Sequence, residues 1–110
     1  MANPLRGEVE LKAGEKTYVL RYTTNALVEL EERTGRSVMD IANRPSFKDA
    51  RALVWAGLIH ANPDLTLEQA GEIMDAAGFT EAIQAASQAL RKAFGRAVEG
   101  NLGDRAARSA

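Results

Sequence analysis

The chain has 110 residues, with 14 Lys and Arg against 15 Asp and Glu, so its formal net charge at pH 7 is −1. This length is typical of one domain, and the near-neutral charge argues against nonspecific nucleic-acid binding, which depends on an excess of cations. The chain has no Cys and a single His, which excludes disulfides and thiolate sites and leaves little for zinc or triad chemistry. An enzyme is therefore not expected, and no cofactor is predicted.

Alternating apolar residues near the start of the chain predict a β-hairpin over residues 8–22. Val9 and Leu11 fall on one side of the first run, and Tyr18, Leu20 and Tyr22 fall on one side of the second. Because a lone two-stranded hairpin is not stable in water, its apolar face must pack on the helices that follow.

Helical periodicity, caps and breakers predict helices over about 25–34, 38–43, 47–61, 66–77 and 80–98. Gly35 is expected to end the first helix and Ser37 to begin the second, while Thr66 and Gln69 form a capping box on the fourth. The fold class is α+β, mainly α, with the hairpin packed on a compact bundle of about four to five helices. Residues 1–98 form one globular domain, and residues 99–110 are expected to be a disordered polar tail.

The stretch of residues 52–61, ALVWAGLIHA, carries no charged residue on any face of its predicted helix. A helix that is apolar all round is surrounded by other elements, so this one is expected at the centre of the domain. Trp55, Leu58 and Phe94 are the predicted core anchors, and Gly57 is expected where a neighbouring backbone passes close. The Ala residues of the last helix form a small-residue face that either packs inside the domain, the favoured interpretation, or contributes to a partner groove.

Three groups of residues could carry chemistry, but each has a simpler structural interpretation. His60 is interpreted as a partly buried histidine near a helix C-terminus rather than a general base, because no nucleophile motif accompanies it. Glu29, Glu31 and Glu32 are interpreted as a solvated helix face rather than a metal site. The helix pair within residues 66–94 has no base-reading side chain at the start of its second helix, which argues against DNA binding.

Charge is segregated along the second half of the chain. No Lys or Arg occurs between Arg51 and Arg91, where the acids of the fourth helix fall, and a basic stretch then begins at Arg91. This pattern indicates either complementarity with helix dipoles or two patches that steer a partner or subunit contact. The candidate partner or self-association patches are Glu68, Glu72, Asp75, Arg91, Lys92 and Arg96.

The segments RGEVEL, YVLRYTTNALVELEERTGRSVMDI and ALVWAGLIHANPDLTLEQAGEIM resemble the tail assembly chaperone family of siphophage-like particles over residues 5–98. The chain is most similar to the small tail protein of gene transfer agents and related prophages, which is also labelled a tail tube protein. The resemblance implies a non-enzymatic factor that binds the tape measure protein and assists tail assembly in the bacterial cytoplasm. It also implies the tail tube protein as a second partner.

Other interpretations remain open. A structural tail component would stay in the finished, virion-like particle, and a small DNA-binding regulator is a weaker third hypothesis. A homo-oligomer is compatible with the charge pattern, whereas nucleic acid and membrane are not expected as partners. No apolar signal segment begins the chain, and residues 52–61 are about half the length that a membrane-spanning helix needs, so a cytoplasmic protein is expected.

Overall fold

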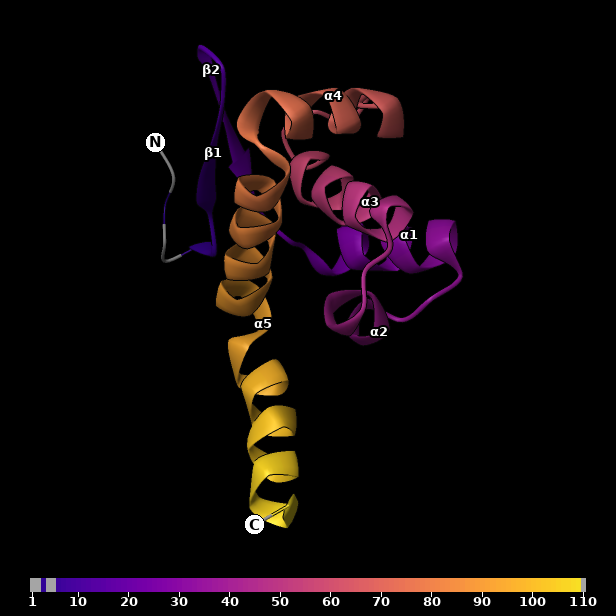
Figure 1. Cartoon of the computed structure of the whole chain (residues 1–110), viewed down its shortest axis with the longest axis vertical. Helices are drawn as coiled ribbons and strands as arrows, with labels where there is room; N and C mark the ends of the chain where they lie inside the picture. Colours follow the sequence, from indigo (N-terminus) through magenta and orange to yellow (C-terminus); the bar gives the residue numbers. More distant parts are fainter. Residues whose placement is uncertain (1–2, 4–5, 110) are drawn as a thin grey trace.

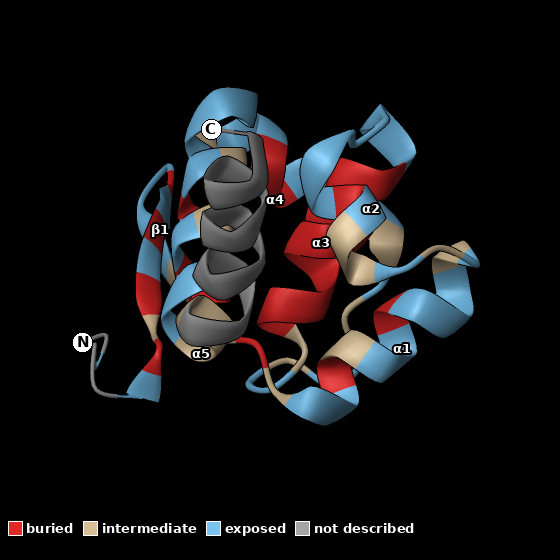
Figure 2. Cartoon of the chain, turned by 90° about the horizontal axis from the view of Figure 1, so that it is seen from below, coloured by how far each residue is buried: buried red, intermediate tan, exposed pale blue. Residues whose placement is uncertain are grey.

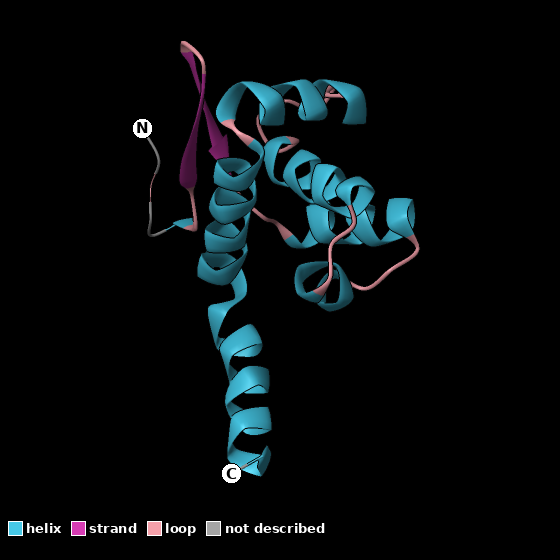
Figure 3. Ribbon diagram, in the orientation of Figure 1, coloured by secondary structure: helices cyan, strands magenta, loops and turns pink. Residues whose placement is uncertain are grey.

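The computed structural model describes the backbone of residues 3 and 6–109 and the side chains of residues 3 and 6–95. A two-stranded hairpin is followed by five helices (Figures 1 and 3). The prediction of an α+β fold, mainly α, is confirmed. The elements are β1 (Val9–Ala13), β2 (Lys16–Leu20), α1 (Thr24–Thr34), α2 (Val38–Asn43), α3 (Phe47–Leu58), α4 (Leu67–Ala77) and α5 (Phe79–Ser109).

The hairpin presents one apolar face to the helices. Its strands pair antiparallel with Val9 opposite Leu20, and the two-residue loop begins with Gly14 at a φ of 64°. A positive φ at this position suits glycine, which has no Cβ to clash. The inward-facing residues of β1 are buried, and this strand packs against α4 and α5. Just before β1, the backbone of Gly7 lies against Ala93 of α5.

The caps that the sequence predicts are present. Gly35 ends α1 in the left-handed conformation with a φ of 69°, and its N–H donates to the carbonyl of Glu31. The Ser37 hydroxyl accepts a bond at the start of α2, and Thr66 and Gln69 form the expected capping box on α4. Each cap supplies a partner to backbone groups that the helix itself leaves unpaired.

Helix α3 forms the centre of the molecule, as its uncharged sequence predicts. All residues from Ala52 to Leu58 are buried, and α3 contacts α1, α2, α4, α5 and β2. Figure 2 shows this helix buried among the surrounding elements. Trp55 and Leu58, two of the predicted core anchors, are 4% and 0% exposed.

The end of β2 is held directly on α3 by polar contacts. The Tyr22 hydroxyl donates to the Leu53 carbonyl over 2.7 Å, and the Arg21 N–H donates to the Gly57 carbonyl over 2.9 Å. The close backbone approach expected at Gly57 is therefore present. His60 adds a third contact, because its Nε2 lies 2.8 Å from the Val19 carbonyl oxygen.

Helix α3 ends at Leu58, three residues before the predicted end at residue 61. Pro63 disfavours helical backbone in the residue before it, and Asn62 instead turns back on the helix. The Asn62 side-chain amide donates to the Leu58 carbonyl over 3.1 Å, which caps the end of α3. His60 consequently lies beyond the helix and is exposed rather than partly buried.

Helix α5 differs from its prediction in two ways. It extends to Ser109, past the predicted end at residue 98, in a stretch that contains the good helix formers Ala, Leu and Arg. Its backbone departs from helical geometry at Phe94, with φ −135° and ψ 29°. Phe94 is therefore only half-buried at a kink, not a fully buried anchor. The disordered tail predicted for residues 99–110 differs from this helical backbone, which continues through Ser109.

We expect Gly57→Ala to destabilise the protein although alanine favours helix. An added Cβ would lie 2.8 Å from Leu20 Cδ2 and 3.0 Å from Tyr22 Cζ, both in a packed core. Overpacking of this kind costs about 1–3 kcal/mol, which exceeds the gain of roughly 1 kcal/mol in helix propensity. Urea unfolding measures the change. Gly71→Ala is the control, because its Cβ would meet only the flexible Arg51 side chain at 3.3 Å. Equal effects of the two substitutions would contradict the close packing at Gly57.

Tyr22 should make the folded state sensitive to alkaline pH. Burial raises the pKa of the Tyr22 phenol well above its ordinary value of 10.0. Above pH 10 the unfolded chain loses this proton and the folded chain keeps it, so the free energy of unfolding falls as pH rises. The slope from one such group is at most about 1.4 kcal/mol per pH unit. Urea unfolding between pH 8 and 11 should show this slope in the wild type and in Tyr18→Phe, and a reduced slope in Tyr22→Phe.

Candidate protein-binding site

A stripe of side chains along α5 faces α2 and α3 across a hollow. Phe79, Ile83, Ser87 and Leu90 recur at intervals of three or four residues, which places them on one side of the helix. Leu90 is only 6% exposed, so the accessible part of this stripe runs from Phe79 to Ser87, about 12 Å or two helical turns at 1.5 Å per residue. It is therefore long enough to accompany a short partner helix.

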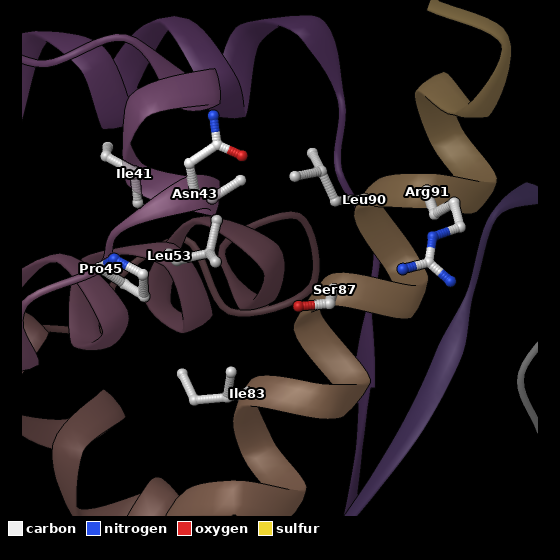
Figure 4. Close-up of a pocket in the computed structure, with 9 residues that line it drawn as sticks. Ile41, Asn43, Pro45, Leu53, Ile83, Ser87, Leu90 and Arg91 are labelled. Carbon is white, nitrogen blue, oxygen red and sulfur yellow. The ribbon is translucent and has the colours of Figure 1, made fainter. Parts of the chain in front are cut away.

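The opposite wall of the hollow comes from α2, the α2–α3 loop and α3. Ile41, Pro45 and Leu53 face Ile83 and Leu90 across the opening (Figure 4). The polar residues Asn43, Ser87 and Arg91 also line this hollow. The lining is therefore mainly apolar with a few polar groups, a composition typical of binding pockets.

An exposed aromatic pair borders the same surface. Phe47 is 80% exposed and Phe79 is 42% exposed, and their ring centroids are 5.2 Å apart with an interplanar angle of 55°. They line a second hollow with Ala50, and this hollow shares Pro45 and Ile83 with the first. We call the combined surface the aromatic groove; it comprises Ile41, Pro45, Phe47, Leu53, Phe79, Ile83 and Leu90.

Helix starts explain why the two phenylalanines are outside the core. Ser46 is the N-cap of α3 and forms a capping box with Asp49, so Phe47 occupies the first helical position, before the buried face begins. Gly78 ends α4 with a φ of 99°, and α5 starts at once with Phe79. Asp49 is buried and also pairs with Arg36, which ties the beginning of α3 to the segment between α1 and α2. The two phenylalanines thus lie at helix starts that are fixed by the Ser46 capping box, the Asp49–Arg36 ion pair and the Gly78 cap.

The predicted charge patches lie on separate helices. Glu68, Glu72 and Asp75 are exposed on α4, at intervals that place them on one face. Arg91 and Lys92 are exposed on α5, about 18 Å along the helix from Phe79 at 1.5 Å per residue. No ion pair joins the acidic and basic groups within the described part of the chain. The Arg96 side chain lies outside the described residues.

The Ala residues of α5 and the glutamates of α1 make contacts that explain their positions without a binding role. The small-residue face of α5 packs inside the domain rather than lining a groove, since Ala82, Ala85, Ala86 and Ala89 are all buried. Among the glutamates of α1, Glu31 accepts a hydrogen bond from the Val38 N–H at the start of α2. The Glu29 carboxylate lies 4.0 Å from Arg33 Nε.

Neither a metal site nor a membrane-spanning helix is present among the described residues. Within the described residues, no group of three or more His, Cys, Asp or Glu side chains is placed to hold a metal ion. In the same part of the chain, no helix combines the length and apolar character needed to cross a membrane.

Comparison with known proteins gives the family. Residues 6–96 match the model of a family described as "Phage tail tube protein, GTA-gp10". The chain belongs to this family. The match includes β1 through the kink of α5, and so all elements that form the aromatic groove. It supports a phage or gene transfer agent tail protein, and it leaves open whether family members act in assembly or remain in the tail. Among curated proteins and solved structures, no match was found.

The aromatic groove is not evident from the sequence pattern. Phe47 and Phe79 are large apolar residues in helical segments, a pattern that favours burial. The available signal was their position directly after Ser46 and Gly78, at helix starts rather than within an apolar face. Arg91 was a candidate for its charge, and the structure places it at the groove.

We expect Phe47→Ser to change stability far less than a substitution in the core. The Phe47 side chain is 80% exposed, so its removal should change the free energy of unfolding by less than about 1 kcal/mol. Leu58→Ala is the comparison, because Leu58 is fully buried and its truncation should cost about 2–5 kcal/mol. Chemical denaturation of the two variants measures the difference, and a comparable loss in both would show that Phe47 supports the fold.

Proposed function

We propose that this protein is a non-enzymatic tail assembly chaperone that binds the tape measure protein in the bacterial cytoplasm before the tail is complete. Family membership supports a role in tail assembly or structure. The observation that carries the more specific proposal is the aromatic groove, with an exposed aromatic pair beside an apolar hollow. The accessible apolar surface here consists of Phe47, Phe79 and the partly buried Ile83, while Ile41, Leu53 and Leu90 lie buried beneath it. Exposed aromatic side chains grouped in this way mark a site of protein interaction.

The dimensions and lining of the groove favour a helical partner. The accessible stripe from Phe79 to Ser87 spans about two turns, which suits a partner helix with apolar residues at positions i, i+3 or i+4, and i+7. Long tape measure proteins contain extended helices with apolar stripes that aggregate when uncovered. Arg91 at the groove favours a partner stripe that carries an acidic residue at this end.

The charge patches support binding of several copies side by side. Glu68, Glu72 and Asp75 on α4 and Arg91 and Lys92 on α5 are exposed on different elements of the same molecule. A contact between the acidic patch of one copy and the basic patch of the next is heterologous, and such contacts generate rows or rings rather than closed pairs. This arrangement suits a chaperone that covers a long partner, with the tail tube protein as a further partner.

A structural tail component is the second candidate, and the family description as a tail tube protein favours it. Tube subunits rely on an extended β-sheet to close their rings. The described residues of this chain contain one sheet, formed by two strands of five residues each. The predominance of helix therefore favours the chaperone.

Co-expression with the neighbouring tape measure protein, followed by affinity capture and light scattering, tests the proposal. We expect the wild type to keep the partner soluble in complexes that hold several copies per chain. The double variant Phe47→Ser/Phe79→Ser should reduce capture at least tenfold. Val28→Ser is the control, because Val28 is 47% exposed on α1, outside the groove.

Two outcomes would contradict the chaperone. If the tape measure protein stays insoluble despite co-expression, the proposal that this protein binds and solubilises that partner is wrong. Stoichiometric recovery of the protein from purified, complete particles would instead favour the structural tail component.

A further inference from the structure

Helix α5 continues beyond the body of the domain as an arm. After the kink at Phe94, its backbone stays helical through Ser109. Figure 1 shows this part of α5 leading away from the other elements, at the end of the molecule opposite α4. At 1.5 Å per residue, residues 95–109 are about 22 Å long. We call this segment the distal arm.

The sequence of the distal arm does not support an isolated helix. Gly100 and Gly103 lie in its interior, and each glycine costs about 1 kcal/mol relative to alanine in a helix. A helix of about 15 residues is marginal in water even when it consists mostly of alanine. The helical backbone of the arm is therefore expected to depend on packing against another surface.

The apolar residues of the arm match the accessible part of the aromatic groove in length. Val98, Leu102 and Ala106 recur every four residues in the sequence, a spacing that places them on one side of a helix. They span about 12 Å at 1.5 Å per residue, the same length as the accessible stripe from Phe79 to Ser87. The arm thus has the pattern of apolar positions that the groove favours in a partner helix.

Charge is a secondary feature of this match. Arg91 lines the groove, and Glu99 adjoins Val98 in the sequence of the arm. The arm also carries Arg96, Arg105 and Arg108, so it is not acidic overall. The length and spacing of the apolar residues, and not the net charge, therefore identify the arm as the occupant of the groove.

The arm does not reach the groove of its own molecule. The stripe from Phe79 to Ser87 and the arm lie on opposite sides of the kink, and the arm leads away from the stripe (Figure 1). Folding back would require the chain to reverse its direction near Phe94 and would break helical turns on both sides. A second copy can present its arm without any such change.

We propose that the distal arm of one copy binds in the aromatic groove of a second copy. The apolar side of the arm packs on the accessible side chains of the groove, Phe47, Phe79 and Ile83. This contact joins two different surfaces, so it links copies into rows or rings. The inference rests on the proposed function, because the arm occupies the groove that the tape measure helix would enter. The bound arm covers the exposed aromatic pair until a tape measure helix displaces it.

Light scattering of the full-length protein alone tests this inference, at high salt to weaken any contact between the charge patches. We expect the wild type to self-associate at micromolar concentrations. The groove variant Phe47→Ser/Phe79→Ser and the arm variant Val98→Ser/Leu102→Ser should each associate about tenfold more weakly. Val28→Ser is the control and should behave like the wild type, because Val28 is exposed on α1 outside the groove. A wild type that stays monomeric would overturn the inference.

Mixing the two double variants is a sharper test. The groove variant keeps an intact arm, and the arm variant keeps an intact groove. Each should be mainly monomeric alone, and the mixture should form a complex with one copy of each, because only one productive contact is possible. Failure of the mixture to form this complex would contradict binding of the arm in the groove.

A peptide provides a measurement that needs no variant of the protein. The blocked peptide with the sequence of residues 95–109 should dissociate the wild-type assembly, because it competes for the groove. The same peptide with Val98→Ser and Leu102→Ser should leave the assembly intact. Equal effects of the two peptides would show that the apolar side of the arm does not bind.

Capture of the tape measure protein separates this inference from the proposed function. The arm variant should capture it at least as well as the wild type, because no arm competes for the groove. If the groove variant loses capture but self-associates like the wild type, the chaperone proposal stands and the inference is wrong. If the groove variant loses self-association but keeps full capture, the inference stands and the groove is not the tape measure site.

Discussion

The burial of α3 on all sides is the constraint on which the rest of the structure depends. A helix that contacts four other helices and a strand is apolar along its central turns, from Ala52 to Leu58, and it needs small residues where neighbours come close. Gly57 provides this space where the end of β2 donates a backbone hydrogen bond to the helix. The hairpin, α1, α4 and α5 are therefore positioned by a common centre, and single changes in α3 affect several elements together.

The aromatic groove uses α3 as part of its floor. Phe47 and Leu53 of this helix line it. Sites built on a packed helix are held more rigidly than sites built on loops. A partner would therefore meet a groove of nearly fixed shape.

Local signals explain how much of the fold could be predicted from the sequence. The hairpin follows from period-two alternation, the caps of α1, α2 and α4 follow from single residues, and the central helix follows from a run without charge. The kink at Phe94 and the exposure of Phe47 could not be predicted in this way. Both depend on which surfaces remain uncovered after packing, and the position of Phe47 directly after Ser46 indicates only that it begins a helix.

The contact between the first strand and the last helix determines when the chain can finish folding. β1 packs against α5, and Gly7 lies beside Ala93, so this strand meets its partner only after the roughly 65 residues between them have been synthesised. Until then the apolar side of the hairpin has no cover from α5, and closing so long a loop is slow compared with forming any single helix. Nascent chains that stop before α5 should consequently be the species most prone to aggregate, and native structure should form only after release of nearly the whole domain.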